Sequence, residues 1–261
     1  MSSKIAIIGG TGIDEMPEFA PNSYKCVDSK YGSVHLAEIN ISDKEIIILP
    51  RHGINHNILP NQINYRSQIA VLKSLNVEII FGICAVGALK PNIKTGDFLI
   101  LRDFIDFTHS RKNTFFDNQD DKIVHTDFSF PYCPLCSDIL VRSCEKYNAD
   151  FLDNITYVGV NGPRYETPAE VKMFAMLGGD VVGMTNIPEA ILAKEAGICY
   201  AALAISTNPA TGISKIQLDH NEVREIMMQK EKLLMNVLSE AVSLAHNIND
   251  CQCRKNWNIQ I

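Results

Sequence analysis

Short apolar runs rich in isoleucine and valine recur along the chain and predict the strands of a buried sheet. Most of them are continuously apolar rather than alternating, which is typical of strands covered on both faces. The runs are Lys4–Ile8, Val34–Ile39, Glu45–Leu49, Glu78–Ile83, Phe98–Leu101, Thr156–Val160, Asp180–Gly183 and Tyr200–Ser206.

Segments with a helical period separate several of these runs. They are Arg66–Leu75, Ser137–Tyr147, Pro168–Leu177, Ile187–Ala196 and the longer Asn221–Asn247. The last segment gathers its apolar residues on one broad face, as a helix packed on a sheet does. Alternating strands and helices predict an α/β fold, with a mixed, largely parallel central sheet flanked by helices. No linker-like composition divides residues 1–261, so we expect a single domain, with a C-terminal tail after about residue 248.

Composition and charge narrow the possible partners. The 261 residues are 46% hydrophobic, and 24 Lys and Arg stand against 30 Asp and Glu, for a net charge of −6. That charge gives no general attraction to nucleic acid or anionic lipid. Apolar stretches such as Ile198–Ile205 fall well short of the roughly 18 residues that a membrane helix requires. A strand-like run from Lys4 leaves no room for a secretory signal, so we expect a cytoplasmic protein with no nucleic-acid or membrane partner.

Eight cysteines are spread thinly over the chain, which favours reduced, buried thiols over a disulfide framework. Cys133 with Cys136 and Cys251 with Cys253 form two closer pairs, which together could bind zinc or act as a redox pair. Structural zinc sites usually have two evenly spaced pairs, and these pairs are uneven. We therefore predict core or tail thiols and no metal.

The residues that follow the predicted strands carry the candidate chemistry, because α/β folds bind ligands at the carboxyl ends of their strands. The first strand is followed by Gly9-Gly10-Thr11-Gly12, which exposes backbone N–H groups and the Thr11 hydroxyl. This segment is either an anion cradle or a tight turn. It matches neither the nucleotide P-loop nor the dinucleotide fingerprint.

Two further strand ends offer groups that suit an anion. Arg51 and His52 supply a planar charged fork and an imidazole, although a surface ion pair would use the same residues. Cys84 and Ala85 lie where small residues let the backbone approach a ligand closely. Polar loops also follow later strands, at Asn161–Thr167, Gly183–Glu189 and Ser206–Ala210.

In this order the motifs resemble those of the trimeric nucleoside phosphorylase superfamily, and in particular its methylthioadenosine phosphorylase branch. The resemblance covers nearly the whole chain. It is carried by Gly9-Gly10-Thr11-Gly12, Arg51-His52-Gly53, Asn64-Tyr65, Gly162-Pro163-Arg164, Met184-Thr185, Pro188-Glu189 and Ala193–Tyr200. It implies reversible phosphorolysis, in which inorganic phosphate attacks the anomeric carbon of a purine nucleoside and releases the base and a pentose 1-phosphate.

The resemblance also assigns roles to residues of this chain. His52 and Asn208 become the candidate catalytic residues, and Met184 is expected to pack against the ribose. The phosphate ligands would be Thr11, Arg51, His52, Cys84, Ala85 and Thr185. Inorganic phosphate is the co-substrate, and no metal or organic cofactor is expected.

The base-binding positions depart from the methylthioadenosine branch. Asn208 and Ala210 replace two aspartates that read a 6-amino group, and the Asn208 amide can donate to a 6-oxo group while accepting from N7–H. Glu166 replaces a small hydroxyl residue, and its carboxylate can only accept, which suits the N1–H of hypoxanthine or guanine. Tyr165 is expected to stack on the base, and Pro209 is a further candidate substrate-binding residue. The segments Tyr165-Glu166-Thr167 and Ser206-Thr207-Asn208 resemble those of the 6-oxopurine-specific members of the family. The sequence thus predicts a 6-oxopurine nucleoside phosphorylase acting on inosine and guanosine.

The 5′ end of the sugar leaves an alternative open. His220 would bond a 5′-hydroxyl where the methylthioadenosine branch has an aliphatic residue, or it is only a solvated residue at a helix start. His125 retains a position from which a neighbouring subunit closes the 5′ pocket in that branch, so methylthioinosine and methylthioadenosine remain alternative substrates. The resemblance implies a homotrimer or a dimer of trimers. A non-catalytic nucleoside-binding protein with the same fold is a further alternative.

Overall fold

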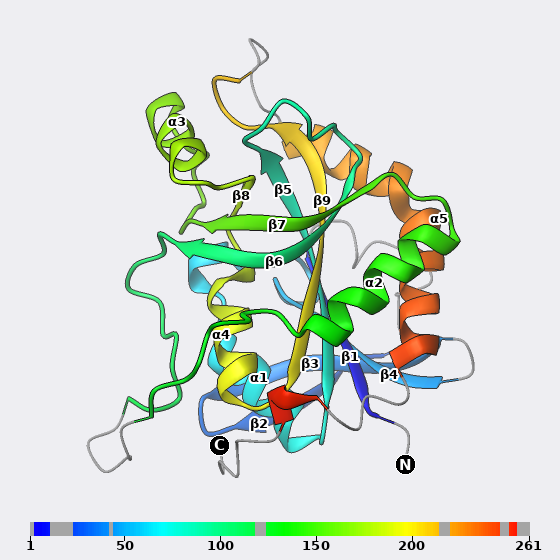
Figure 1. The fold of residues 1–261 in the computed structure, drawn as a ribbon. Helices are drawn as coiled ribbons and strands as arrows, with labels where there is room; N and C mark the ends of the chain where they lie inside the picture. Colours follow the sequence, from blue (N-terminus) through cyan, green and yellow to red (C-terminus); the bar gives the residue numbers. More distant parts are fainter. Residues whose placement is uncertain are drawn as a thin grey trace.

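Nine strands form one mixed sheet within the residues that the computed structural model describes, which are 3–10, 23–41, 44–117, 124–213, 220–245 and 251–254 (Figure 1). The strands are β1 (Ile5–Gly9), β2 (Lys25–Ser29), β3 (Gly32–Ile41), β4 (Lys44–Pro50), β5 (Ile79–Ala88), β6 (Phe98–Asp106), β7 (Phe151–Gly159), β8 (Val181–Gly183) and β9 (Cys199–Pro209). The helices are α1 (Tyr65–Ser74), α2 (Pro134–Lys146), α3 (Pro168–Met176), α4 (Asn186–Glu195) and α5 (His220–Leu244), with short 3₁₀ turns η2 (Pro60–Gln62) and η4 (Gln252–Arg254).

The sheet is open at one end and closed at the other. Its order is β2-β3-β4-β1-β5-β8-β7-β6-β9, and β9 also pairs with β5, so the last five strands close into a ring. Strand β1 runs parallel to β4 and β5, and β5 runs parallel to β9. Pairings at β2–β3, β3–β4, β5–β8 and β6–β9 are antiparallel. The predicted mixed α/β sheet is confirmed.

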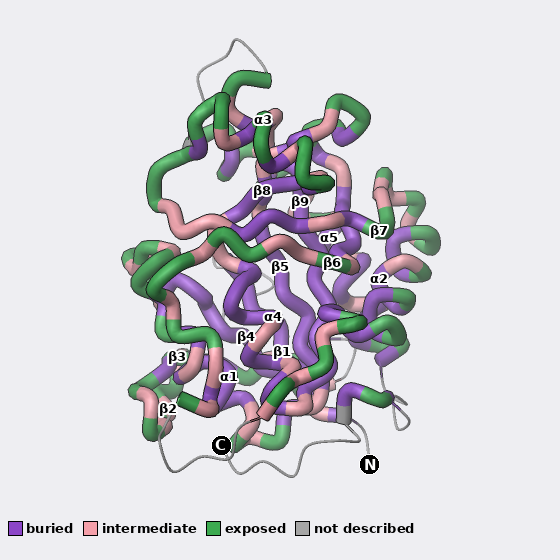
Figure 2. The backbone as a smooth tube through the Cα atoms, turned by 60° about the vertical axis from the view of Figure 1, so that its left-hand side comes forward, coloured by how far each residue is buried: buried purple, intermediate pink, exposed green. Residues whose placement is uncertain are grey.

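Both faces of the central strands are buried, as their continuously apolar sequences predict (Figure 2). Successive residues of β1 alternate between two cores, with Ala6 and Ile8 in one and Ile5 and Ile7 in the other. Helices α1 and α4 contribute to the first core, and α2 and α5 contribute to the second (Figure 1). Two covered faces leave the strand ends as the accessible part of the sheet.

The predicted strands and helices are present, but several strand ends differ from the prediction. Strand β5 continues from Ile83 to Ala88 and β9 continues to Pro209, so Cys84, Ala85 and Asn208 lie within strands rather than after them. Strand β2 is absent from the prediction because Lys25–Ser29 is a mostly exposed edge strand without an apolar run. Strand β6 continues to Asp106, beyond the predicted end at Leu101, and its added residues are only partly buried. No helix in the described part of the chain is both long and apolar enough to cross a membrane.

Candidate active site

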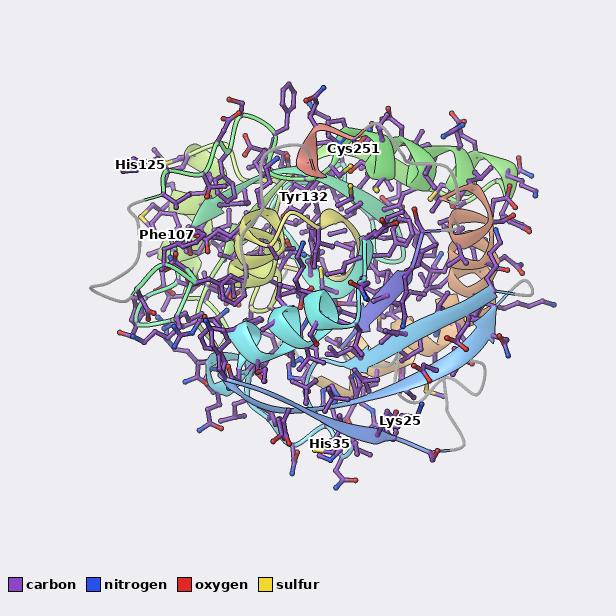
Figure 3. The ribbon with its side chains drawn as sticks, turned by 90° about the horizontal axis from the view of Figure 1, so that it is seen from below. Lys25, His35, Phe107, His125, Tyr132 and Cys251 are labelled. Carbon is purple, nitrogen blue, oxygen red and sulfur yellow. The ribbon has the colours of Figure 1, made fainter. Side chains whose placement is uncertain are left out.

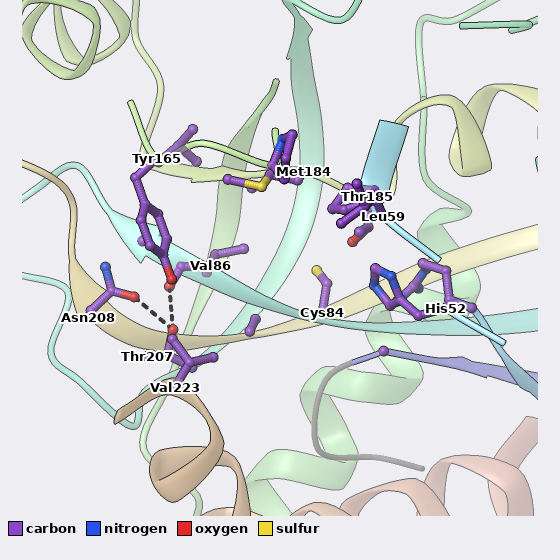
Figure 4. Close-up of a pocket in the computed structure, with 18 of the residues that line it drawn as sticks. His52, Leu59, Cys84, Val86, Tyr165, Met184, Thr185, Thr207, Asn208 and Val223 are labelled. Atoms are coloured by element: carbon purple, nitrogen blue, oxygen red, sulfur yellow. Dashed lines mark hydrogen bonds between the residues drawn. The ribbon is translucent and has the colours of Figure 1, made fainter. Parts of the chain in front are cut away.

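A cavity of about 540 Å³ lies where the ends of β1, β4, β5, β8 and β9 meet (Figure 4). It brings together most of the residues selected from the sequence. Those on its lining are Arg51, His52, Cys84, Ala85, Tyr165, Glu166, Met184, Thr185, Asn208 and Ala210. Figure 4 shows His52, Cys84 and Thr185 at one end and Tyr165 and Asn208 at the other, with Met184 between them.

Four predicted residues stand apart from this group. Thr11 and the side chain of His220 lie outside the described residues. Pro209 and His125 are described and do not line the cavity. Pro209 ends β9, where its carbonyl accepts a hydrogen bond from Asn208 Nδ2 at 2.9 Å. His125 is exposed and lies at the edge of the molecule in Figure 3, where it is available to another molecule.

Arg51 is completely buried and forms a bidentate ion pair with the equally buried Glu189. Its Nε donates to Glu189 Oε2 at 2.7 Å, and its Nη2 donates to Oε1 at 2.9 Å. Nη1 donates to the carbonyl of Ile83 at 2.8 Å. Burial opposes the charge of Arg51, but the Glu189 carboxylate outweighs that cost and raises the pKa of Arg51 above its usual value. The surface ion pair considered from the sequence is wrong, since the pair is internal.

A chain of buried hydroxyl and amide groups holds Glu189 in turn. Tyr200 donates to Glu189 Oε1 at 2.6 Å, and Asn186 Nδ2 donates to the Tyr200 hydroxyl at 2.9 Å. Burial and the nearby carboxylate raise the pKa of Tyr200 well above its usual value, so the hydroxyl keeps its proton and remains a donor. Gly82 is required at this point, because a Cβ there would overlap the Tyr200 hydroxyl. The network fixes the guanidinium of Arg51 against the cavity.

One ring nitrogen of His52 bonds to the backbone of the loop that follows it. Nδ1 lies 2.7 Å from the carbonyl oxygen of Ile58, which can only accept, so Nδ1 carries a proton. Nε2 lies on the side of the ring nearest Gly10, where it accepts in the neutral ring and donates once the ring is protonated. Gly10 leaves room for Arg51 rather than for His52, because a Cβ at Gly10 would lie 2.8 Å from Arg51 Nη1 but 3.6 Å from His52 Nε2.

Cys84 and Thr185 complete this end of the cavity. Burial raises the pKa of the Cys84 thiol to about 12, so the thiol stays neutral and is not a nucleophile at physiological pH. Thr185 stands immediately before α4, and its backbone N–H donates to the Tyr157 hydroxyl at 3.1 Å. The end of the cavity formed by His52, Cys84 and Thr185 therefore contains hydrogen-bond donors and no acidic side chain among these residues.

Glu166 is an acidic residue on the cavity lining, next in sequence to Tyr165, and only 7% of it is exposed. Burial raises the pKa of its carboxyl, and the nearby Glu170 adds to this, while Arg164 opposes it. Arg164 is itself engaged, through a bidentate pair with Glu170. Thr167 and Glu170 form a capping box that begins α3 and fixes the chain just after Glu166.

A bulge in the pairing of β5 with β9 orients Asn208. The register shifts between Val86 and Gly87, so Val86 pairs with Ser206 and Gly87 pairs with Asn208. Thr207 is the extra residue, and its hydroxyl donates to Asn208 Oδ1 at 2.9 Å (Figure 4). Since Oδ1 accepts this bond and Nδ2 donates to Pro209, each keeps capacity for one ligand hydrogen bond.

Apolar groups form the walls between the two polar ends. Tyr165 points toward Thr207 and Asn208 in Figure 4, and Met184 lies above the middle of the cavity. Leu59 and Val223 contribute further apolar surface, the latter from the first turn of α5. Because α5 begins at His220, three residues before Val223, the predicted 5′-end residue belongs to the same turn.

Some functional residues were missed from the sequence. Glu189 was noted only as part of a motif, although a carboxylate in the largely apolar segment Ile187–Ala196 was a signal that it needed a buried partner. Tyr200 belongs to the motif Ala193–Tyr200 and to a predicted strand, and neither indicates its bond to Glu189. Thr207 gained its role from a bulge that no local pattern indicates.

Comparison with known proteins agrees with this geometry. Residues 4–243 match the family described as the phosphorylase superfamily. The chain is 42% identical over 251 residues to a probable 6-oxopurine nucleoside phosphorylase of Moorella thermoacetica, covering 96% of each chain. It is 41% identical to the 6-oxopurine nucleoside phosphorylase of Pyrococcus furiosus, again over 96% of each chain. A probable S-methyl-5′-thioinosine phosphorylase of Methanothermobacter thermautotrophicus is 40% identical, over 96% of this chain and 87% of the relative.

Solved structures show the same fold. The methylthioadenosine phosphorylase of Schistosoma mansoni in complex with adenine superposes with a TM-score of 0.88 at 30% identity, covering 93% of this chain and 91% of that one. Fold and site together define an α/β protein with one cavity, which has Arg51 and His52 on its lining together with Glu166 and Asn208. The chain belongs to the phosphorylase superfamily, as the motifs indicated.

Proposed function

We propose that this chain is a purine nucleoside phosphorylase that catalyses the reversible phosphorolysis of 6-oxopurine nucleosides, chiefly inosine and guanosine. The observation that carries the proposal is the buried carboxylate of Glu166 in the same cavity as Arg51, His52 and Thr185. Curated relatives at 41 to 42% identity carry the name 6-oxopurine nucleoside phosphorylase.

Phosphate binds at the end formed by His52, Cys84 and Thr185. The buried ion pair with Glu189 fixes the orientation of the Arg51 guanidinium. The Nη1 hydrogen that does not bond to Ile83 is therefore held in a fixed direction for phosphate. The Thr185 hydroxyl and the backbone of Cys84 and Ala85 supply neutral donors. His52 Nε2 accepts from a protonated phosphate oxygen or, as imidazolium, donates to an ionised one. Thr11 is proposed as a further donor.

The reaction forms a bond between a phosphate oxygen and the anomeric carbon as the bond to the base nitrogen breaks. The electron pair of the broken bond goes to the purine, which takes up a proton from solvent at N7. Positive charge develops on the sugar in the oxocarbenium-like transition state, and the phosphate beneath it stabilises that charge. Met184 packs against the ribose. Inorganic phosphate is the co-substrate, and the step needs no metal or organic cofactor.

Base selection rests on Glu166 and Asn208. Asn208 Oδ1 accepts from N7–H of the departing purine, and its Nδ2 donates to the 6-oxo group. Glu166 accepts from N1–H, and from the 2-amino group of guanine as well. Adenine offers an acceptor at N1, which would face the carboxylate unpaired, and such buried mismatches discriminate by about 10⁴-fold in favourable cases. Tyr165 stacks on the base, and Ala210 leaves room beside it.

S-methyl-5′-thioinosine is the second candidate substrate, with S-methyl-5′-thioadenosine behind it. Methylthioinosine carries the same 6-oxopurine base, so Glu166 and Asn208 do not distinguish it from inosine. The apolar side chains of Leu59 and Val223 on the cavity wall favour a methylthio group, whereas His220 favours a hydroxyl. Relatives named as probable methylthioinosine phosphorylases support keeping this candidate.

We further propose a cytoplasmic homotrimer, or a dimer of trimers, that serves purine salvage. The exposed position of His125 supports a role in a neighbouring subunit's active site rather than in its own. Nucleic acids and membranes are not proposed as partners.

Product analysis tests the reaction type. With inosine, hypoxanthine should form only when phosphate is present, together with an equal amount of ribose 1-phosphate. Free ribose formed without phosphate would show a hydrolase instead. Nucleoside binding without turnover at saturating phosphate would show a non-catalytic binding protein.

A further inference from the structure

Four cysteine thiols meet on the side of the sheet covered by α2 and α5. Cys133 precedes α2, Cys199 is the first residue of β9, and Cys251 and Cys253 lie at η4 near the end of the chain. All four residues are buried, and their Sγ atoms all lie within 4.8 Å of one another. Figure 3 shows Cys251 beside α2.

This set corrects the one considered from the sequence. Cys136 was grouped with Cys133 because of their spacing, but the structure replaces it with Cys199, from a strand far away in the sequence. The backbone explains the replacement, since Cys133 N–H donates to the carbonyl of Tyr200 at 2.7 Å and so holds Cys133 beside Cys199.

The arrangement matches the geometry of a tetrathiolate metal centre. Zinc–sulfur bonds of about 2.3 Å in a tetrahedron place the sulfur atoms about 3.8 Å apart. Sγ of Cys133 and Sγ of Cys251 lie 3.3 Å apart, and the 4.8 Å limit applies to every pair in the set. Two disulfides would require only two close pairs, whereas here each sulfur is close to the other three.

A cation lies next to the cluster. Lys194 Nζ is 3.9 Å from Cys253 Sγ, and it is held there by donating to the carbonyl of Phe130 at 2.9 Å. Four thiolates around one divalent ion carry a net charge of −2, which is costly to bury without a compensating cation. Lys194 is placed to offset part of that charge.

We propose that Cys133, Cys199, Cys251 and Cys253 bind one structural zinc(II) ion. Binding converts four thiols to thiolates and releases their four protons to solvent, with no change of oxidation state. The ion joins the chain end to the starts of α2 and β9. Cys199 and Asn208 are nine residues apart on β9, or about 30 Å along a strand, so the ion takes no part in phosphorolysis. This proposal differs from the expectation of no metal that the spacing of the cysteines gave.

Metal analysis of the full-length protein, purified without chelators under reducing conditions, tests this proposal. We expect one zinc per chain. After metal removal, cobalt(II) should restore one equivalent and produce the charge-transfer absorption of thiolate ligation. The variants Cys199→Ser and Cys253→Ser should lose both signals, whereas Cys144→Ser, a buried control on α2 outside the set, should keep them.

A chelator should lower the Tm of the wild-type protein and of the Cys144→Ser control, and added zinc should restore it. If the serine variants do not fold, the zinc content and the cobalt spectrum of the wild-type protein still show whether the four thiols bind one metal ion. Reduced wild-type protein that takes up neither zinc nor cobalt would overturn the proposal. Zinc retained at one equivalent in Cys199→Ser, or alkylation and mass analysis showing two disulfides among the four cysteines in freshly purified protein, would overturn it as well.

Discussion

Replacing Glu166 by glutamine tests the base-reading end of the cavity without changing its shape. In the proposed complex the buried carboxylate accepts a charge-assisted hydrogen bond from N1–H of a 6-oxopurine. Such a bond contributes about 1.5–3 kcal/mol, against about 1 kcal/mol for the neutral bond that the glutamine carbonyl can still accept. The difference of roughly 0.5–2 kcal/mol should lower kcat/KM for inosine by about 2- to 30-fold. The glutamine amide can donate to N1 of adenine, so kcat/KM for adenosine should fall less or rise.

The pKa of Glu166 gives this prediction a second readout. As pH falls through the raised pKa, the wild-type carboxyl gains a proton and loses its acceptor role, so kcat/KM for inosine should decline on the acid side. That acid limb should be absent from the glutamine variant. The ionised Glu166 carboxylate supports activity but lowers the free energy of unfolding, because it is buried. The buried carboxyl does not reduce stability below its unfolded pKa. The cost grows as pH rises from the unfolded pKa to the raised folded pKa, and it is constant above that value.

Glu166→Gln should therefore raise Tm at neutral pH, and the gain should vanish in acid. Steady-state phosphorolysis over a range of pH and thermal unfolding at matched pH provide the measurements. Glu145→Gln, at an exposed carboxylate on α2, is the control and should change neither. An unchanged ratio of inosine to adenosine kcat/KM in Glu166→Gln would refute the assignment of Glu166 as the reader of N1.

Three further substitutions probe other parts of the site. Asn208→Asp should shift preference toward 6-aminopurine nucleosides in a competition assay, and an unchanged ratio would show that Asn208 does not read position 6. Glu189→Gln should leave Arg51 buried without a full countercharge, lower the free energy of unfolding in urea by about 3 kcal/mol and raise the KM for phosphate. Equal stability would mean that the pair does not hold Arg51. His125→Ala should raise the KM for inosine and leave Tm unchanged. Light scattering should show that wild type and variant are both trimers, and a fully active wild-type monomer would contradict the shared site.

The location of the site could be predicted because strand ends are visible in the sequence. The apolar run Glu45–Leu49 ends just before Arg51, which follows β4, and the covered faces of the sheet leave little else accessible. The predicted strand end at Ile83 is wrong, because β5 continues through Cys84 to Ala88. The chemistry of each strand-end residue followed from its side chain and from the resemblance of the motifs. Strand β2 could not be predicted from the sequence, because its residues are mostly exposed and have no apolar pattern.

The remaining features depend on contacts between distant residues. Glu189 lies 138 positions from Arg51, so their pairing has no local signal. The bulge at Thr207 arises from the register of β9 against β5. Cys199 joins the thiol cluster only because the backbone of Cys133 pairs with that of the neighbouring Tyr200. Local spacing predicted Cys136 instead.

The most direct test of the proposed activity is kcat/KM at saturating phosphate for inosine, guanosine, methylthioinosine, methylthioadenosine and adenosine, measured on one preparation. The buried Glu166 and the Asn208 amide predict that kcat/KM is highest for inosine and guanosine and much lower for both 6-aminopurine nucleosides. If kcat/KM is highest for methylthioinosine, the assignment of the base-binding residues stands, and the predicted preference for a 5′-hydroxyl is wrong. A highest value for methylthioadenosine or adenosine would contradict the central claim.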